Sequence, residues 1–428
     1  MNEATRSDPN AGSGDAGRTP AAGAHGPLTG IRVLELGQLI AGPFAARMLA
    51  DFGADVVKVE PPDRVDAAGR AVDGGDPLRK WRVLHPPGPE GTSLWWSVQA
   101  RNKRSITLDL RSAEGQAAVR ELAASADIVI ENFRPGALEQ WGLGYEDLRA
   151  RNRGLILVRL SGYGQDGPYR DRPGFGSIAE AMGGLRYVTG FPDRPPVRMN
   201  LSIGDSIAAL HAVIGATMAL HHRHRTGEGQ VVDVALYEAV FNMMESSLTE
   251  YSATGVVRER TGTNLTGIVP SNTYPTSDNG HVVIGANGDS IFKRLTKAMG
   301  RPDLHDDPAY ANNAGRAAHA AFLDAAIADW TRTLTQAECL VRLAAADVPS
   351  GKIYSVADMV DDPQFAAREM LLPLEMPDGA RFLQPGIVPR MSATPGRVRW
   401  QGPPLGAHND EVLGELGYDP QDRPEAGR

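Results

Sequence analysis

The chain has 428 residues, too many for one ordinary hydrophobic core, so two domains are expected. Its composition, 42% hydrophobic and 22% charged residues, is that of a soluble globular protein without an apolar run long enough to cross a membrane. A net charge of −8 argues against a general nucleic-acid-binding surface, and Cys339 as the only cysteine excludes internal disulfides and cysteine-rich metal sites. We predict no metal site.

Residues 1–27 are mostly Gly, Ala, Asp, Asn and Pro without an apolar core. This composition is typical of a disordered tail, not of a signal or transit peptide. The cytoplasm is therefore the expected location.

The first elements form a β-α-β unit. Residues 31–36 are predicted as a strand, residues 43–52 as a helix that Pro43 begins and Gly53 ends, and residues 55–60 as a second strand. The connection lacks the Gly-x-Gly-x-x-Gly fingerprint of dinucleotide sites. The helix N-terminus near Ala41 still offers free N–H groups to a phosphate.

The same alternation continues downstream. Strands are predicted at residues 104–110, 127–133, 155–160 and 230–236, and helices at 113–126, 135–152 (broken near Gly142 and Gly144), 176–182 and 236–253. Repeated β-α units with apolar strands predict a parallel sheet that helices cover on both faces. Ligands of such sheets bind beyond the carboxyl ends of the strands.

The predicted fold class is α/β, with a large domain and a smaller α+β domain; the family resemblance given below implies that the large domain is Rossmann-like and is built from both ends of the chain. The expected segments are a tail (1–27), the first part of the large domain (28–225), a helix and linker (226–268), the small domain (269–348), and a return linker with the rest of the large domain (349–428).

Asp205 opens a helix of small and apolar residues that starts near Gly204. Taken alone, Asp205 would be interpreted as a helix N-cap, because its carboxylate suits the positive end of the helix dipole. A catalytic role follows only from the resemblance below.

Many short motifs occur here in one collinear order. They include Gly-Ala-Asp-Val-Val-Lys-Val-Glu-Pro-Pro at 53–62, Glu-Asn-Phe-Arg-Pro-Gly at 131–136, Ser-Gly-Tyr-Gly-Gln-Asp-Gly-Pro at 161–168, Gly204-Asp205, and further matches at 28–36, 41–43, 102–105, 174–175, 223–230 and 404–413. From residue 28 onward the chain resembles the family III CoA-transferases, which include formyl-CoA:oxalate and carnitine CoA-transferases and the acyl-CoA racemases. The match is weakest at 255–276.

The resemblance implies a homodimer of two interlocked chains that uses acyl-CoA and a carboxylic acid as substrates and no tightly bound cofactor. It also implies that Asp205 is the nucleophile. A carboxylate can attack a thioester to form an anhydride, and the released CoA thiolate can then form an aspartyl-CoA thioester. Backbone N–H groups would stabilise the oxyanions.

The resemblance also carries over ten CoA-binding positions: Ile40, Ala41, Leu108, Asp109, Leu110, Arg111, Asn132, Phe133, Arg134 and Phe175. Two family arginines are replaced by Pro61 and Gln140, which suggests phosphate contacts from Arg134 or Arg104 instead. Phe175-Gly176 stands where formyl-CoA transferases have Tyr-Glu, and their glycine-rich flap is not recognisable here.

Three functions stay open at this point. The first is CoA transfer from succinyl-CoA to a dicarboxylate or hydroxy-dicarboxylate, because residues 175–184 resemble the succinyl-CoA-using branch; Arg172 or Arg198 would bind the distal carboxylate. The second is a 2-methylacyl-CoA racemase, although Phe175 replaces the racemase histidine. The third is a non-catalytic CoA-binding homologue, against which the intact Gly204-Asp205 argues.

Overall fold

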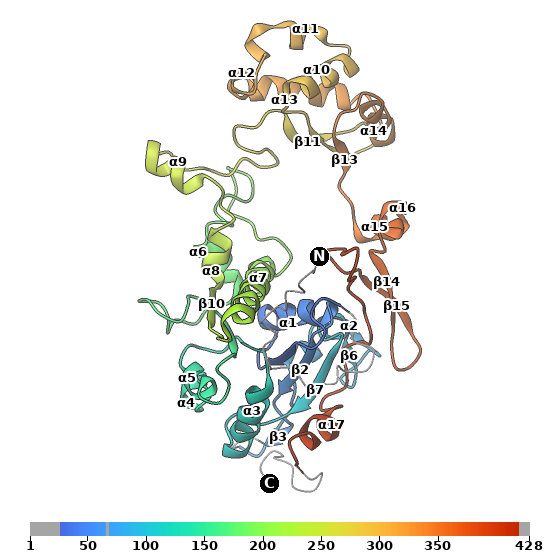
Figure 1. Ribbon diagram of the computed structural model, residues 1–428. Coiled ribbons are helices and arrows are strands. Elements are labelled where there is room, and N and C mark those ends of the chain that lie inside the picture. Colours follow the sequence, from blue (N-terminus) through green and yellow to red (C-terminus); the bar gives the residue numbers. More distant parts are fainter. Residues whose placement is uncertain (1–25, 66–67, 419–428) are drawn as a thin grey trace, which may run out of the picture. The chain divides into compact units, whose positions relative to one another are not determined.

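The computed structural model describes residues 26–65 and 68–418, and a six-stranded parallel sheet is its largest element (Figure 1). The predicted tail lies outside the described residues except for residues 26 and 27. The strand order is β10-β9-β8-β1-β2-β7. The strands are β1 (Arg32–Glu35), β2 (Asp55–Glu60), β7 (Lys103–Thr107), β8 (Ile128–Glu131), β9 (Ile156–Ser161) and β10 (Val231–Ala235). The predicted parallel sheet is confirmed.

The order of strands reverses at β1. The chain proceeds from β1 to β2 and β7 in one direction, and then from β8 to β9 and β10 in the other. The connections that leave β1 and β8 therefore diverge and leave a crevice at the carboxyl ends of these two strands. Such a switch point is where open α/β sheets bind ligands.

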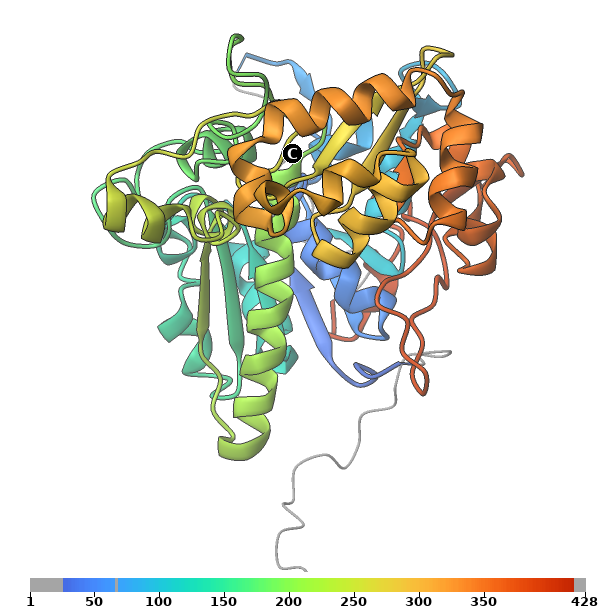
Figure 2. The same cartoon turned by 90° about the horizontal axis from the view of Figure 1, so that it is seen from above.

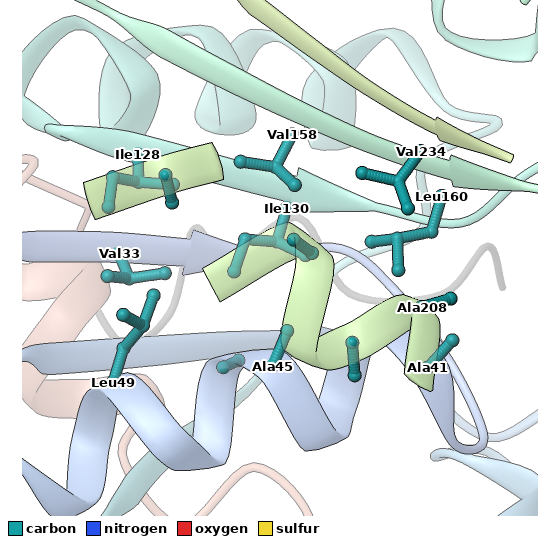
Figure 3. Close-up of a cluster of buried hydrophobic side chains, with 14 of the residues drawn as sticks. Val33, Ala41, Ala45, Leu49, Ile128, Ile130, Val158, Leu160, Ala208 and Val234 are labelled. Atoms are coloured by element: carbon teal, nitrogen blue, oxygen red, sulfur yellow. The ribbon is translucent and has the colours of Figure 1, made fainter. Parts of the chain in front are cut away.

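Helices cover both faces of this sheet because its strands are apolar on both sides. Val33 and Leu34 of β1 show the alternation, since Val33 packs in one core and Leu34 in the other. The first core, drawn in Figure 3, includes α1 (Ala41–Asp51) and α7 (Ile203–Thr226). The second core includes α3 (Ala113–Ser125) and α17 (Asn409–Gly414).

The long helix α7 contacts α1, β9 and β10 and runs beside the sheet in Figure 2. Ala208, Ala212 and Ala216 are buried on its inner face, where their small side chains allow close packing. Among the described residues α7 is the one helix with the length and composition to cross a membrane, which is weak support for a membrane span. The alanine-rich face of α7 is instead packed in the first core.

The described residues form two units. The first comprises those of Met1–Ala179, Ser202–Val240 and Leu372–Arg428, and the second those of Glu180–Leu201 and Phe241–Leu371. Three predicted segments, 28–225, 226–268 and 349–428, are thus each shared between the units; the domain limits themselves stay a prediction. Besides the sheet, the first unit contains β3 (Arg64–Val65), β4 (Ala71–Val72), a 3₁₀ helix (Pro77–Lys80), β5 (Leu84–His85), β6 (Thr92–Ser93), α2 (Leu94–Gln99), α4 (Ala137–Gln140), α5 (Tyr145–Arg149) and β15 (Arg381–Pro385).

The second unit has an antiparallel sheet of order β11-β12-β13 with its own apolar core. Its elements are α9 (Ser247–Thr254), β11 (Ser271–Pro275), β12 (His281–Gly285), α10 (Asp289–Ala298), α11 (Pro302–Asp306), a 3₁₀ helix (Pro308–Tyr310), α12 (Asn313–Ala318), α13 (Ala320–Thr331), α14 (Gln336–Ala345), β13 (Ser350–Lys352), α15 (Val356–Asp361) and α16 (Pro363–Ala367). Three elements cross the division: α6 (Gly176–Met182), α8 (Leu236–Phe241) and β14 (Leu371–Glu375).

The structure corrects one predicted helix. Residues 236–253 form two helices, α8 and α9, because the chain leaves helical geometry between them and Glu245 takes a positive φ of 49°. The break predicted near Gly142 and Gly144 is present between α4 and α5.

The C-terminal segment covers the outer edge of β7. His408 exchanges hydrogen bonds with Ser105, donating its backbone N–H to the Ser105 carbonyl and accepting the Ser105 N–H at Nδ1 (3.0 and 3.1 Å). Asn409 Oδ1 accepts the Thr107 N–H at 2.8 Å. These contacts give His408 a structural place that its motif alone did not reveal.

Candidate functional site

A pocket of about 330 Å³ lies at the carboxyl ends of β1, β2, β7 and β8. This volume is at the lower end of the range of small-molecule sites. Its wall includes apolar side chains, the paired aromatic rings of Phe133 and Trp141, and two arginines, Arg64 and Arg111. Apolar and aromatic walls with a few charged groups suit a nucleotide base and its phosphates.

Five of the ten predicted CoA-binding residues line this pocket: Leu108, Asp109, Leu110, Arg111 and Phe133. Arg111 is paired with Asp109, whose carboxylate lies 2.8 Å from its Nε. This hydrogen bond, which outweighs slight desolvation, holds the pKa of Asp109 below its ordinary value. The pair stays ionised near neutral pH. Because the Asp109 carboxylate offsets the charge of Arg111, Arg64 supplies further positive charge in the pocket wall.

Ile40 and Ala41 are buried at the start of α1, directly after the connection that leaves β1. Asn132, at the end of β8, reaches across the switch point to this connection. Its Oδ1 accepts the Gln38 N–H, and its Nδ2 donates to the Gln38 carbonyl, both at 2.8 Å. The Asn132 amide thus binds the protein's own backbone, a role that the sequence did not predict.

A buried ion pair fixes the segment after β8. The Phe133 N–H donates to Glu131 Oε2 at 2.7 Å, while Arg159 donates to Glu131 and to Glu139 at 2.7 and 2.6 Å. Burial raises the pKa of Glu131 to about 7, although the Arg159 charge opposes this change. The Phe133 backbone is therefore held by a network that spans β8, β9 and α4.

Neither of the two alternative phosphate contacts, Arg104 and Arg134, lines the pocket. Arg104 is almost fully buried in ion pairs with Asp55 and Glu411, 2.6 and 2.9 Å away, so its proposed contact with CoA is wrong. Arg134 is exposed and does not line the pocket.

Three glycines after β9 lie where the backbone passes close to another group, and the last of them, Gly176, lies beside Asp205. Gly162 and Gly174 pack backbone to backbone, since a β-carbon on Gly162 would lie 2.8 Å from the Gly174 Cα. The chain then passes Phe175, whose side chain is 67% exposed, and begins α6 at Gly176. A β-carbon on Gly176 would lie 2.1 Å from Asp205 Oδ2.

Asp205 is the third residue of α7 and is half-buried. The helix N-cap is Ser202, so the interpretation of Asp205 as an N-cap is wrong by three residues. Its carboxylate still lies in the first helical turn, where the helix dipole favours a negative charge.

The chain matches the description CoA-transferase family III over residues 28–409. The chain belongs to CoA-transferase family III. It is 53% identical to succinyl-CoA–D-citramalate CoA-transferase of Chloroflexus aurantiacus over 91% of this chain and 94% of the relative. It is 42% identical to the beta subunit of succinyl-CoA–L-malate CoA-transferase of the same organism, over 91% and 94%.

The fold agrees with this membership. A CAIB/BAIF family protein from Brucella suis has 36% sequence identity and a TM-score of 0.76, with 92% of this chain and 100% of that chain covered. The predicted family and enzyme class of this CoA-transferase are therefore confirmed, as is its similarity to succinyl-CoA-using enzymes.

The two arginines suggested for the acid substrate lie in different surroundings. The Arg172 guanidinium stacks on the Tyr169 ring, 3.6 Å from its centre. In the second unit, Arg198 and Arg186 lie 3.4 and 3.5 Å from Oε2 of the buried Glu180. The Arg198 side chain is 46% exposed, which leaves part of its guanidinium open to a ligand.

Sequence reasoning missed the buried charges beneath the pocket of this CoA-transferase. Lys58 and Lys103 both contact Glu35, at 2.8 and 2.7 Å, and Lys58 also contacts Asp76 at 2.9 Å. One indication of these charges was present in the sequence: Lys58 lies among the valines of β2, and a buried lysine needs a carboxylate partner. In the part of the chain that the structure describes, no group of three or more His, Cys, Asp and Glu residues could hold a metal ion.

Proposed function

We propose that this enzyme transfers CoA from succinyl-CoA to a dicarboxylate or hydroxy-dicarboxylate, with Asp205 as the covalent catalyst. The observation that carries the proposal is the Asp205 carboxylate in the first turn of α7, against the side-chain-free backbone of Gly176. Relatives named for citramalate, malate and glutarate transfer support the substrate class.

The reaction begins when an Asp205 oxygen attacks the thioester carbonyl of succinyl-CoA. The C–S bond breaks, and the products are an aspartyl-succinyl anhydride and CoA thiolate. The thiolate then attacks the aspartyl carbonyl of the anhydride, which releases succinate and leaves an aspartyl-CoA thioester. Each step exchanges one activated acyl group for another.

The second half of the reaction repeats these steps in reverse order with the acceptor acid. Its carboxylate attacks the aspartyl-CoA carbonyl and expels the thiolate, which forms a second anhydride. The thiolate then attacks the acceptor carbonyl of this anhydride, giving the new acyl-CoA and regenerating the Asp205 carboxylate. N–H groups near the start of α7 are our candidates for stabilising the oxyanions.

For CoA we propose the pocket at the carboxyl edge of the sheet, with the nucleotide against Phe133, Leu108 and Arg111 and the connection to α1 beside it. The remaining predicted contacts, Asn132, Arg134 and Phe175, are proposed from the family resemblance alone. For the distal carboxylate of the acid, Arg198 is the candidate because its guanidinium is partly exposed.

We further propose a homodimer in the cytoplasm. Leu210, Ile214 and Met218 are exposed and lie four residues apart, so they form one apolar stripe on the outer face of α7. A large exposed apolar patch is typical of an interface with another protein. The interlocked arrangement rests on the family resemblance.

The decisive experiment is mass spectrometry of the enzyme after incubation with succinyl-CoA and hydroxylamine. We expect a mass change confined to the peptide that contains Asp205, and none in Asp205→Ala, which should still bind CoA. Retained turnover in Asp205→Ala would refute the mechanism.

Two assays separate the alternatives. The first assay incubates a 2-methylacyl-CoA with the enzyme in deuterated water and no acceptor acid. Exchange of the α-proton for deuterium would indicate a racemase and refute the proposed transfer. A panel of acids tests the substrate class, and transfer from monocarboxylyl-CoA donors but not from succinyl-CoA would overturn it.

A further inference from the structure

The connection between β1 and α1 is held at three consecutive residues by side chains from distant parts of the first unit. Lys58 Nζ donates to the Gly37 carbonyl at 2.7 Å. Asn132 binds both the N–H and the carbonyl of Gln38. The Leu39 N–H donates to Asp76, whose two carboxylate oxygens lie 3.1 Å away. Ile40 and Ala41 follow directly.

Leu39 has a φ of 65°, which is the left-handed conformation. A leucine side chain is unfavourable in this region, and such a residue stays there only when its surroundings enforce it. Asp76 supplies that constraint, because it binds the N–H of the strained residue itself.

Asp76 is itself immobilised and almost fully buried. One of its oxygens accepts the Leu78 N–H at 2.9 Å, its own N–H donates to Glu60 at 2.8 Å, and Lys58 lies 2.9 Å away. Its neighbours Gly75 and Pro77 line the pocket. The pocket wall and the connection to α1 are therefore joined through one carboxylate.

Both groups of the pair are kept ionised. Burial opposes the charge on each, but the Asp76 and Glu35 carboxylates raise the pKa of Lys58 above its ordinary value. The Lys58 charge and the Leu78 and Leu39 N–H groups likewise lower the pKa of Asp76.

We propose that Asp76, paired with Lys58, is a positioning residue for CoA binding: it holds the backbone at 37–39 so that Ile40 and Ala41 take the place the acyl-CoA requires. The inference rests on the proposed function, which puts CoA at these two residues. Asp76 acts through this backbone, because its buried side chain leaves no surface for substrate.

The test is Asp76→Ala in the full chain, with KM for succinyl-CoA, kcat, and Kd for CoA by calorimetric titration. We expect KM and Kd to rise about tenfold or more, since a hydrogen bond to a charged group is lost, with kcat changed by less than about threefold. Asp76→Asn keeps an oxygen for the Leu39 N–H and should show a smaller rise.

The matched control is Asp51→Ala. Asp51 is also buried and ion-paired, with Arg101 at 2.7 Å, but it lies at the opposite end of α1. We expect a similar loss of melting temperature without the rise in KM. Equal rises in KM for both variants would overturn the inference and indicate a general loss of stability.

A second variant tests the backbone directly. Glycine accepts a positive φ, so Leu39→Gly should reduce the need for Asp76. In a double-mutant cycle, Asp76→Ala should raise KM less in the Leu39→Gly background than in the wild type. The same rise in both backgrounds would contradict the inference. Absence of transfer by the wild-type enzyme would instead refute the proposed function, while the CoA titration would still test Asp76.

Discussion

The backbone of Gly176 lies directly against the carboxylate of Asp205. A β-carbon at residue 176 would come within 2.1 Å of Oδ2 and 2.6 Å of Cγ, far inside van der Waals contact. The carboxylate is the end of a side chain that can rotate, so a larger residue here would turn it away and leave the fold intact. This makes residue 176 a direct probe of how Asp205 is oriented.

We expect Gly176→Ala to lower kcat/KM for CoA transfer by roughly a hundredfold, since small displacements of a reacting group have effects of this size. The melting temperature should change little. Gly414→Ala is the control, because a β-carbon there meets no atom within 4 Å. Full activity in Gly176→Ala would show that the orientation of Asp205 in the free enzyme is not the one used in catalysis.

Arg198→Gln should weaken binding of the acceptor acid. Loss of a charge-assisted hydrogen bond predicts a rise in KM for the acid of about tenfold or more, with KM for succinyl-CoA less affected. Arg194→Gln is the control from the same loop, because Arg194 stacks on Phe191. Steady-state kinetics with both substrates varied would measure the two KM values. An equal rise in KM for the acid in the two variants would show that Arg198 does not bind the acid.

Stability should fall in mild acid because of His408. Burial lowers the pKa of His408 below its ordinary value, with Arg104 adding to this effect and Glu411 opposing it, and Nδ1 accepts the Ser105 N–H. The unfolded chain therefore takes up the proton first, and stability is lost as the pH falls from about 6.5 through the lower folded pKa.

Melting temperatures between pH 7.5 and 5 test this expectation. His408→Gln, which retains an acceptor oxygen but does not titrate, should show a smaller decrease over that range. A pH dependence identical to the wild type would assign the acid sensitivity to other groups.

Met218→Glu should dissociate the proposed homodimer, because it puts a charge at the most exposed residue of the apolar stripe on α7. Sedimentation or light scattering would then report a single chain. Val341→Glu on α14 is the control, since the two side chains are similarly exposed, 67% and 70%. A wild-type enzyme that is monomeric throughout would contradict the dimer.

The sequence predicted the sheet well because its strands are short apolar runs; the limits of β2 agree to the residue. Helix α6 was also predicted correctly, whereas the break at Glu245 was missed because no glycine or proline marks it. Asp205 came from the resemblance, since local pattern alone indicated only a cap.

The partners of the buried groups beneath the site were not predictable, because they are remote in the sequence. Gln38 and Asn132 are 94 residues apart, and Leu39 and Asp76 are 37 apart. Lys58 also alternates with valines in β2, a pattern that would normally place its ammonium group in solvent, whereas both faces of this sheet are covered.

The segment that covers β7 has a consequence for synthesis of the protein. Asn102 donates its N–H to Trp400, and His408 and Asn409 bind the strand further along. A growing polypeptide that has reached residue 371 contains all of the second unit, yet the edge of its parallel sheet is still open. Open strand edges pair readily with other chains. Release of residues 400–409 from the ribosome is thus the event that ends this exposure, and ribosomes that stall before it leave nascent chains prone to aggregate.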